Sequence, residues 1–141
     1  MDLGQHGVLA QLGSTHGELA DRMGIETVEA SAERIVMTMP VEGNRQPFGL
    51  LHGGATGVLI ETAGSIAGTM HAMTLGKVAL GIELSVSHHR AAQEGVVTCT
   101  ATAMSLGRTL ATYHCEVTDE TGRRIATGRL TCALREMAPP G

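Results

Sequence analysis

The sequence predicts a single α+β domain in which one long helix is wrapped by a five- or six-stranded antiparallel sheet. Three observations predict this fold. Residues 55–70 carry a wide, largely apolar stripe at helical spacing through about four turns: Ala55, Val58, Leu59, Thr62, Ala63, Ile66, Ala67 and Met70. A β-like hairpin precedes this stretch, and four further β-like segments follow it with short turns between them. The chain of 141 residues suffices for one domain, so we expect residues 1–141 to form one unit.

The elements before the long helix are short. Thr15 and Glu18 have the spacing of a capping box, and Gly24 is a typical helix stop, so a short helix is predicted near residues 15–23. Residues 25–41 indicate a hairpin whose second arm, residues 34–39, ends at Pro40. At the other end of the chain, residues 138–141 are expected to be a loose tail.

The β-like segments after the helix alternate apolar and polar residues. In residues 78–89 this alternation places four aliphatic side chains on one face: Leu80, Ile82, Leu84 and Val86. Residues 96–105, 109–118 and 123–134 follow, separated by the turn signals QEG, LGR and DETG. Short turns between regularly spaced strands favour an antiparallel meander.

The long helix is unusual on the face opposite its apolar stripe. Gly57, Glu61, Gly64 and Gly68 share that face, which therefore lacks the charges of a solvated surface. We expect such a helix to be covered on all sides. Each interior glycine costs about 0.5–1 kcal/mol relative to alanine. The three glycines therefore indicate close approach of another backbone, which in a one-domain chain means a second subunit.

Composition disfavours several classes of function. The formal net charge is −4 and the aromatic residues are Phe48 and Tyr113, which disfavours nucleic-acid binding. The sequence has no apolar run of membrane-spanning length, and its start lacks the features of a signal peptide, so we expect a cytoplasmic protein without membrane association. The three cysteines lack metal-ligand spacing and are typical of buried thiols, so no metal site is predicted.

Glu61 is the one charged residue between Gln46 and Gly76. Burial disfavours a charged carboxylate and raises its pKa, so a glutamate in this helix indicates a catalytic base or nucleophile. The alternative is a structural carboxylate paired with a basic residue of the sheet. Ser65 follows one turn later, where its hydroxyl either holds a water or the carboxylate, or bonds back to a helix carbonyl.

The segment LLHGGATG leads into the long helix. Its paired glycines, Gly53 and Gly54, leave backbone N–H groups uncovered at the positive end of the helix, which suits a bound anion or a developing oxyanion. An ordinary glycine turn is the alternative, but His52 and Gln46 lie close by in the sequence. Gly53 and Glu61 stand about 12 Å apart along a helix. They therefore serve different purposes, or face each other across two subunits.

The segment QPFGLLHGGATGVLIETAGSIAG strongly resembles the active-site helix of the hotdog-fold acyl-CoA thioesterases. The segments GIELSVSHHRAAQEG, SLGRTLATYHCEV and DETGRRIATGRLTCAL extend the resemblance over residues from about 20 to 135. Within the family, the chain is most similar to the branch that holds the dihydroxynaphthoyl-CoA, enterobactin-pathway proofreading and Glu-type hydroxybenzoyl-CoA thioesterases. The resemblance implies a hotdog fold and hydrolysis of an aryl- or medium-chain acyl-CoA.

The resemblance also implies catalytic roles for individual residues. Glu61 would be the nucleophile, or the general base acting on water. The amide of Gly53 would stabilise the thioester oxyanion with help from Gln46. His52 would orient the carbonyl or the leaving thiol, and Ser65 would position water.

Besides Gly54, four further residues are candidates for binding the substrate. His88 corresponds to a strand histidine near the acyl group, although His89 beside it leaves the register open. Arg90 and Arg108 are candidates for the CoA phosphates, with an ordinary solvated surface as the alternative for both.

Partners and cofactors follow from the same resemblance. Thioester hydrolysis needs no metal or redox cofactor, and the CoA moiety is part of the substrate, so no cofactor is expected. The family usually forms pairs of dimers, so we expect a dimer or a dimer of dimers. Two alternatives remain open: a non-catalytic module that binds and senses acyl-CoA, and a hotdog dehydratase or hydratase.

Overall fold

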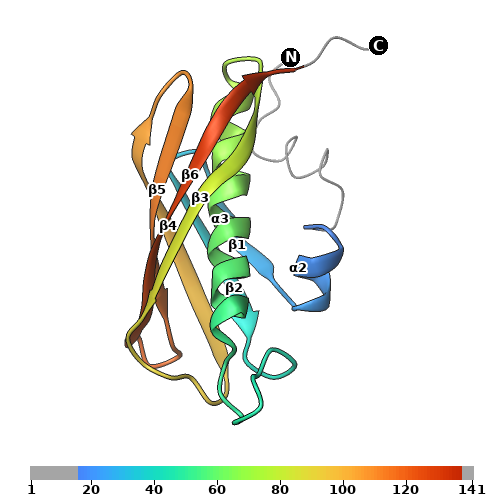
Figure 1. Cartoon of the computed structure of the whole chain (residues 1–141), viewed down its shortest axis with the longest axis vertical. Coiled ribbons are helices and arrows are strands. Elements are labelled where there is room, and N and C mark those ends of the chain that lie inside the picture. The colour runs from blue at the N-terminus through green and yellow to red at the C-terminus, as the bar shows by residue number, and fades with distance from the viewer. Residues whose placement is uncertain (1–15, 138–141) are drawn as a thin grey trace.

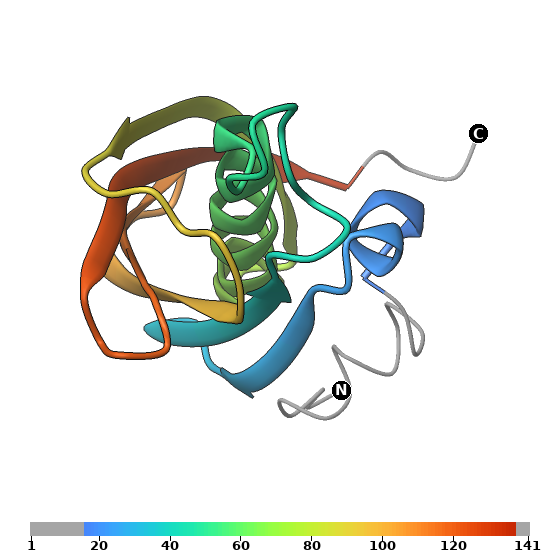
Figure 2. The same ribbon diagram turned by 90° about the horizontal axis from the view of Figure 1, so that it is seen from below.

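The computed structural model describes residues 16–137, which form two helices and one six-stranded antiparallel sheet (Figure 1). The helices are α2 (Glu18–Arg22) and α3 (Gly53–Met73). The strands are β1 (Glu26–Ala30), β2 (Arg34–Pro40), β3 (Lys77–His88), β4 (Val96–Leu106), β5 (Leu110–Thr118) and β6 (Arg124–Glu136). Seen along α3, the sheet curls around the helix, and α2 lies on the side that the sheet leaves open (Figure 2). The predicted α+β architecture is confirmed.

The strand order corrects the predicted meander. Strands β4, β5 and β6 do follow one another, but the sheet runs β1-β2-β4-β5-β6-β3. Strand β3 pairs with β6 and forms one edge, while β4 pairs with β2. The tight turns in residues 107–109 and 119–123 force neighbouring strands to pair. The longer connection over residues 89–95 imposes no such pairing, and it carries the chain away from β3.

The predicted face of β3 is also wrong, because the strand contains a β-bulge. Pairing with β6 shifts between Gly81 and Glu83, so Ile82 is an extra residue. An extra residue reverses which side chains face the helix. Leu84 and Val86 contact α3 at Gly57, whereas Leu80 points away from the helix and is 57% exposed.

The glycines of α3 pack against the sheet of the same chain rather than against a second subunit. A Cβ at Gly64 would lie 3.0 Å from Cβ of Leu130 in β6 and closer still to its Cδ2. A Cβ at Gly68 would lie 3.2 Å from Sγ of Cys132, also in β6. The glycines therefore let α3 lie close to β6. The expectation that Gly64 and Gly68 mark the close approach of a second subunit is wrong.

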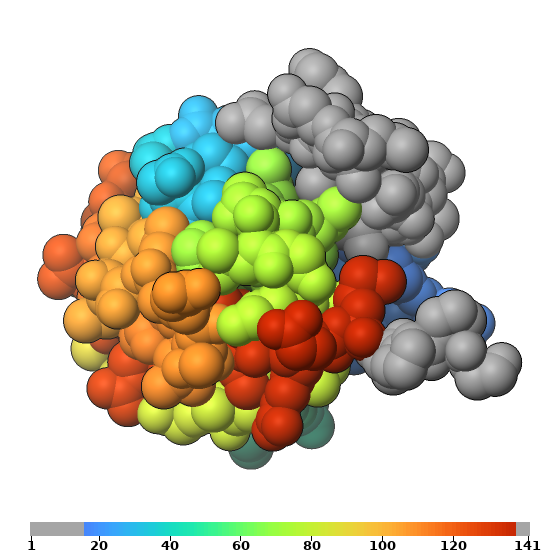
Figure 3. Space-filling model, turned by 90° about the horizontal axis from the view of Figure 1, so that it is seen from above, coloured from blue at the N-terminus to red at the C-terminus, as the bar shows by residue number. Residues whose placement is uncertain are grey.

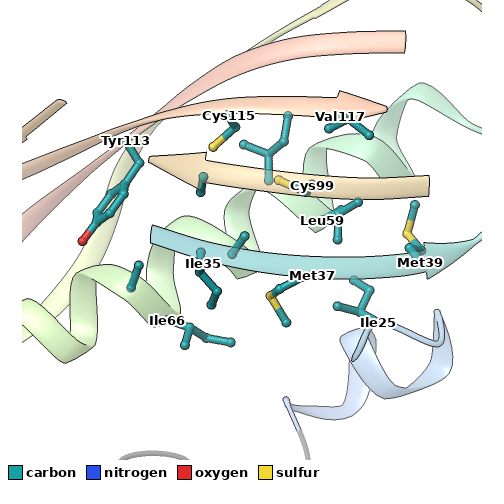
Figure 4. Packing of buried hydrophobic residues seen from close by; sticks show 14 of the residues in the cluster. Ile25, Ile35, Met37, Met39, Leu59, Ile66, Cys99, Tyr113, Cys115 and Val117 are labelled. Carbon is teal, nitrogen blue, oxygen red and sulfur yellow. The ribbon is translucent and has the colours of Figure 1, made fainter. Parts of the chain in front are cut away.

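The helix is also not covered on every side. One stripe of the helix is only partly buried: Val58, Glu61, Thr62, Ser65 and Thr69. Beneath it, the core lies between α3 and the concave face of the sheet (Figure 4). Besides Ile25, which directly precedes β1, the labelled core residues come from β2, β4, β5 and α3: Ile35, Met37, Met39, Cys99, Tyr113, Cys115, Val117, Leu59 and Ile66.

Tyr113 of β5 is fully buried and joins two distant parts of the fold. Its hydroxyl donates a hydrogen bond to the carbonyl oxygen of Ala32, 2.7 Å away, in the turn between β1 and β2. Burial, followed by the charges of nearby groups, raises the pKa of this hydroxyl.

At the front of the described chain, the predicted short helix is confirmed as α2, with a different cap. Its N-cap is Gly17, which makes no side-chain capping bond. Thr15 and the predicted tail at 138–141 lie outside the described residues. Within residues 16–137, no helix has both the length and the apolar character needed to span a membrane.

Candidate active site

The loop over residues 41–52 sets the position where α3 begins. Asn44 is buried and donates from Nδ2 to the carbonyl oxygens of Met23 and Pro40, both at 2.8 Å. Its own carbonyl accepts the N–H of His52 at 2.9 Å. A short bridge between Arg45 and Leu51 closes the loop. The first residue of the helix is therefore fixed to both β2 and α2.

His52 is the N-cap of α3. Its Nδ1 accepts the N–H of Gly54 at 2.8 Å. A ring nitrogen that accepts carries no proton, so the neutral imidazole has its proton on Nε2, which remains available as a donor. The sequence prediction missed this cap. The N–H of Gly54, a predicted substrate-binding group, is thus already used within the chain.

Gly53 presents the unpaired donor at this helix end. Within residues 16–137, its N–H has no acceptor, whereas its carbonyl oxygen lies 3.2 Å from Nε2 of His88. A Cβ at Gly53 would lie 3.0 Å from Cε1 of His88, so glycine is what allows the histidine ring to approach. An uncovered N–H at the positive end of a 21-residue helix suits a developing negative charge.

A groove of about 730 Å³ lies between α2, α3 and β3. Gly53, Glu61 and His88 open onto it, and Leu84 and Val86 supply part of its apolar wall. Glu61 is partly buried, and that burial raises the pKa of its carboxyl group. No basic side chain in the described part of the chain forms an ion pair with it, which excludes the structural pair considered for Glu61 within this region.

A second cavity of about 340 Å³ lies on the other side of the helix start. Gln46, His89 and Arg90 line it, and Gly53 and His88 border both cavities. The amide oxygen of Gln46 accepts the N–H of Phe48 within the loop. Nε2 of His89 lies 2.8 Å from Oγ1 of Thr127. The structure therefore brings Gln46, Gly53 and His88 together on one side, and Gly53, His88 and Glu61 on the other.

Two predicted residues lie apart from this group. Arg108 sits in the turn between β4 and β5, next to Gly107, whose carbonyl lies 2.7 Å from Nε2 of His71 near the end of α3. Figure 3 looks onto this end, where the end of α3 lies against the β4–β5 turn. Gly53 is about 27 Å away along the helix. Ser65 does not line the groove, and no back-bond from its hydroxyl to a helix carbonyl is formed.

The sequence prediction assigned two groove residues to the core. Val58 and Thr62 line the groove, although their helical spacing placed them in the buried stripe. The Thr62 hydroxyl donates to the carbonyl of Val58 at 2.6 Å, which satisfies it within the helix. Among residues 16–137, no three His, Cys, Asp or Glu side chains are grouped so that they could hold a metal ion.

Comparison with known proteins finds thioesterases that are similar to this chain in sequence and in fold. A family model described as the thioesterase superfamily matches residues 48–126. The proofreading thioesterase EntH of Cronobacter turicensis is 40% identical over 132 residues, which cover 92% of this chain and 96% of EntH.

Two solved structures are similar over most of the chain. Thioesterase HI1161 of Haemophilus influenzae has a TM-score of 0.85 and 28% identity, covering 99% of this chain and 95% of its own. A variant of thioesterase SAV0944 of Staphylococcus aureus has a TM-score of 0.80 and 30% identity, covering 86% of this chain and 99% of its own.

Proposed function

Because the chain belongs to the thioesterase superfamily and is a thioester hydrolase with a hotdog fold, we propose that it hydrolyses an acyl-CoA with an aryl or medium-length acyl group. The acting carboxylate is Glu61. The observation that carries this proposal is the position of Glu61 on the groove that also reaches Gly53. Its carboxylate is partly buried there, and no cation among residues 16–137 forms an ion pair with it. Desolvation makes a carboxylate a stronger base and nucleophile, and the reaction needs one of the two.

The proposed chemistry uses two groups. Water, activated by Glu61, or Glu61 itself attacks the carbonyl carbon, and the electron pair of the C=O bond moves onto oxygen. The N–H of Gly53 donates to that oxygen, an interaction worth about 3–4 kcal/mol in other hydrolases. The pair then returns and the C–S bond breaks. If Glu61 acts as the base, the sulfur leaves as the thiol with the proton that Glu61 took from water. If Glu61 is the nucleophile, a water then hydrolyses the acyl-Glu61 anhydride, so that its hydroxyl ends on the free acid and its proton on the CoA thiolate. His52, with its proton on Nε2, is the candidate to orient the carbonyl or the leaving sulfur.

The separation between Gly53 and Glu61 supports a site built from two protomers. Both open onto one groove, but eight helical residues place them about 12 Å apart, whereas both must come within about 3 Å of one thioester. The self-association that we propose brings Glu61 of one protomer to the helix start of its partner. Strand β3 supports this assembly, because it is an open edge with exposed aliphatic residues.

A relative supports the pairing of Gln46 with Glu61. SAV0944 of Staphylococcus aureus has been solved with a glutamine replaced by alanine and, separately, with a glutamate replaced by alanine. In that chain the glutamate stands fifteen positions after the glutamine, which is the separation of Glu61 from Gln46. We therefore keep Gln46 as the helper of Gly53. Arg90, which lines the same cavity as Gln46, remains a candidate for the CoA phosphates.

Hydrolysis is tested by following thiol release from benzoyl-CoA, dihydroxynaphthoyl-CoA and a medium-chain acyl-CoA. We expect turnover of at least one of them, and a loss of about 100-fold or more in kcat for Glu61→Gln, which keeps the shape but not the charge. Binding without thiol release would favour the acyl-CoA-sensing alternative. Turnover indifferent to Glu61→Gln would remove Glu61 from the mechanism.

The two-protomer site is tested by complementation. Glu61→Gln and Gln46→Ala chains are co-expressed, each weakly active alone. Random pairing gives hybrids in half of the dimers, each with one intact site, so about a quarter of the wild-type activity should return. Hybrids that form without recovering activity would contradict a shared site.

A further inference from the structure

We propose that Gly81, in the middle of β3, positions the Glu61 carboxylate, because the missing side chain at Gly81 provides the space that the carboxylate occupies. This inference rests on the proposed function of Glu61. It extends the machinery from α3 and its preceding loop to the edge strand of the sheet.

The contact between the two residues is close. A Cβ at Gly81 would overlap Oε1 of Glu61, and would lie 3.2 Å from Cδ and 3.4 Å from Oε2. Gly81 is not among the glycines with positive φ, so its backbone conformation is open to other residues. What requires glycine at this position is therefore the carboxylate that lies against it.

The β-bulge places this gap at the height of Glu61. Before the bulge, Ala79 and Gly81 face α3, and after it Leu84 and Val86 face the helix. After the bulge, Leu84 and Val86 therefore form an apolar part of the groove wall. Before the bulge, Gly81 leaves the space in which the Glu61 carboxylate lies. Bulges are common beside active sites, where they redirect side chains.

In the part of the chain that the structure describes, no ion pair holds Glu61 against β3. The residue opposite Gly81 on β6 is Cys132, and burial, together with the charge of Glu61, raises the pKa of its thiol to about 11. Cys132 is therefore neutral at neutral pH. Among the described residues, no cation pairs with Glu61. The carboxylate is placed by shape, so removing the gap should move it.

An added methyl should affect the position of Glu61 more than it affects folding. The atom it would meet is the end of a flexible side chain, which can rotate away at little cost to the fold. A displaced carboxylate is no longer aligned for attack, and a misplacement of about 1 Å costs on the order of 100-fold in rate.

The first test is Gly81→Ala. We expect kcat to fall about 10- to 100-fold, KM to stay within about twofold, and the melting temperature to be unchanged. The matched control is Gly68→Ala, which adds the same methyl against Cys132 and Ala79 and does not touch Glu61. Its kcat should remain that of the wild type. Equal losses in kcat for both variants would overturn the inference.

The second test repeats Gly81→Ala in the Glu61→Asp background. The shorter side chain no longer reaches the space beside Gly81, so the methyl should now cost less than about twofold in kcat, and stability should match Glu61→Asp alone. This comparison also decides the matter if Gly81→Ala folds poorly by itself. The same loss in both backgrounds would show that the methyl acts through another part of the fold, and would overturn the inference.

A third measurement separates this inference from the proposed function. The carboxyl carbon of Glu61, identified by its absence in Glu61→Gln, is titrated by NMR in wild type and in Gly81→Ala. We expect the apparent pKa or the chemical shift of Glu61 to change. An unchanged titration would overturn the positioning role. A changed titration in a protein that releases no thiol from any acyl-CoA would leave the positioning role standing while the proposed function fails.

Discussion

At Glu61, partial burial has opposite effects on folding and on catalysis. Burial raises the pKa of the carboxyl above its ordinary value of 4.5, so the folded chain binds this proton more tightly than the unfolded chain. The contribution of Glu61 to stability is therefore complete below pH 4.5, and is lost as the pH rises through the higher folded value. Activity should instead increase as the pH rises, because attack on the thioester needs the ionised Glu61 carboxylate.

Glu61→Gln tests both directions. Its melting temperature should exceed that of the wild type at pH 8, and the difference should disappear as the pH falls towards 4.5. The wild-type kcat/KM should fall on the acid side with an apparent pKa above 4.5. Melting curves from pH 4 to pH 8 measure the first effect, and a pH–rate profile measures the second. A difference in melting temperature that does not depend on pH would contradict the assignment.

The sequence predicted the candidate residues that the structure brings together at the helix start, but not all of their local contacts. A lone carboxylate and a His-Gly-Gly turn stand out because such residues are costly in an apolar helix. The N-cap role of His52 could not be predicted, because it depends on where the ring turns after the loop has closed. Val58 and Thr62 were assigned to the core because helical periodicity shows a stripe and not what covers it.

At the scale of elements, the contact between α3 and β6 depends on the small size of Gly64. Leu130 is fully buried, and a methyl at Gly64 would lie 3.0 Å from its Cβ. We expect Gly64→Ala to lower the free energy of unfolding by roughly 1–2 kcal/mol, since overpacking outweighs the gain in helix propensity.

The matched control for Gly64→Ala is on the same helix. A methyl at Gly57 would meet Leu84 at an ordinary 3.7 Å, so Gly57→Ala should instead gain about 0.5–1 kcal/mol from helix propensity. Urea denaturation of both variants gives the two values. If both substitutions stabilise the protein, the packing argument for Gly64 is wrong.

The sequence predicted the positions of the strands along the chain better than it predicted which strands pair in the sheet. Alternation and turn signals depend on local geometry, so β4, β5 and β6 could be placed in order. The pairing of β3 with β6 and of β2 with β4 is non-local, and no turn residue encodes it. The bulge at Ile82 left no local sign either, because the alternation of apolar residues continues through it. Which β3 side chains face α3 could therefore be determined only from the structure.

For the whole molecule, the exposed edge of β3 predicts the oligomeric state. Ile82 is 58% exposed on this edge, and an edge with aliphatic side chains favours pairing with another strand. We expect the wild type to be a dimer or larger by light scattering. Ile82→Lys should shift the mass towards the monomer and lower the activity, because the proposed site needs two protomers.

The control for the edge is Met104→Lys. Met104 is 63% exposed but lies on β4, an inner strand of the sheet. This variant should keep the wild-type mass if β3 is the interface. An unchanged mass for Ile82→Lys would exclude Ile82 from the contact between protomers.

The hydrogen bond from the Tyr113 hydroxyl to the Ala32 carbonyl can be followed by optical spectroscopy without an added label. The sequence contains one tyrosine and no tryptophan, so tyrosine emission comes from a single ring in the core. The signal of that ring therefore depends on the contact between β5 and the β1–β2 turn. Burial raises the pKa of the Tyr113 hydroxyl, so phenolate absorbance should not appear near the ordinary tyrosine pKa of about 10 during an alkaline titration. It should appear only when this contact breaks.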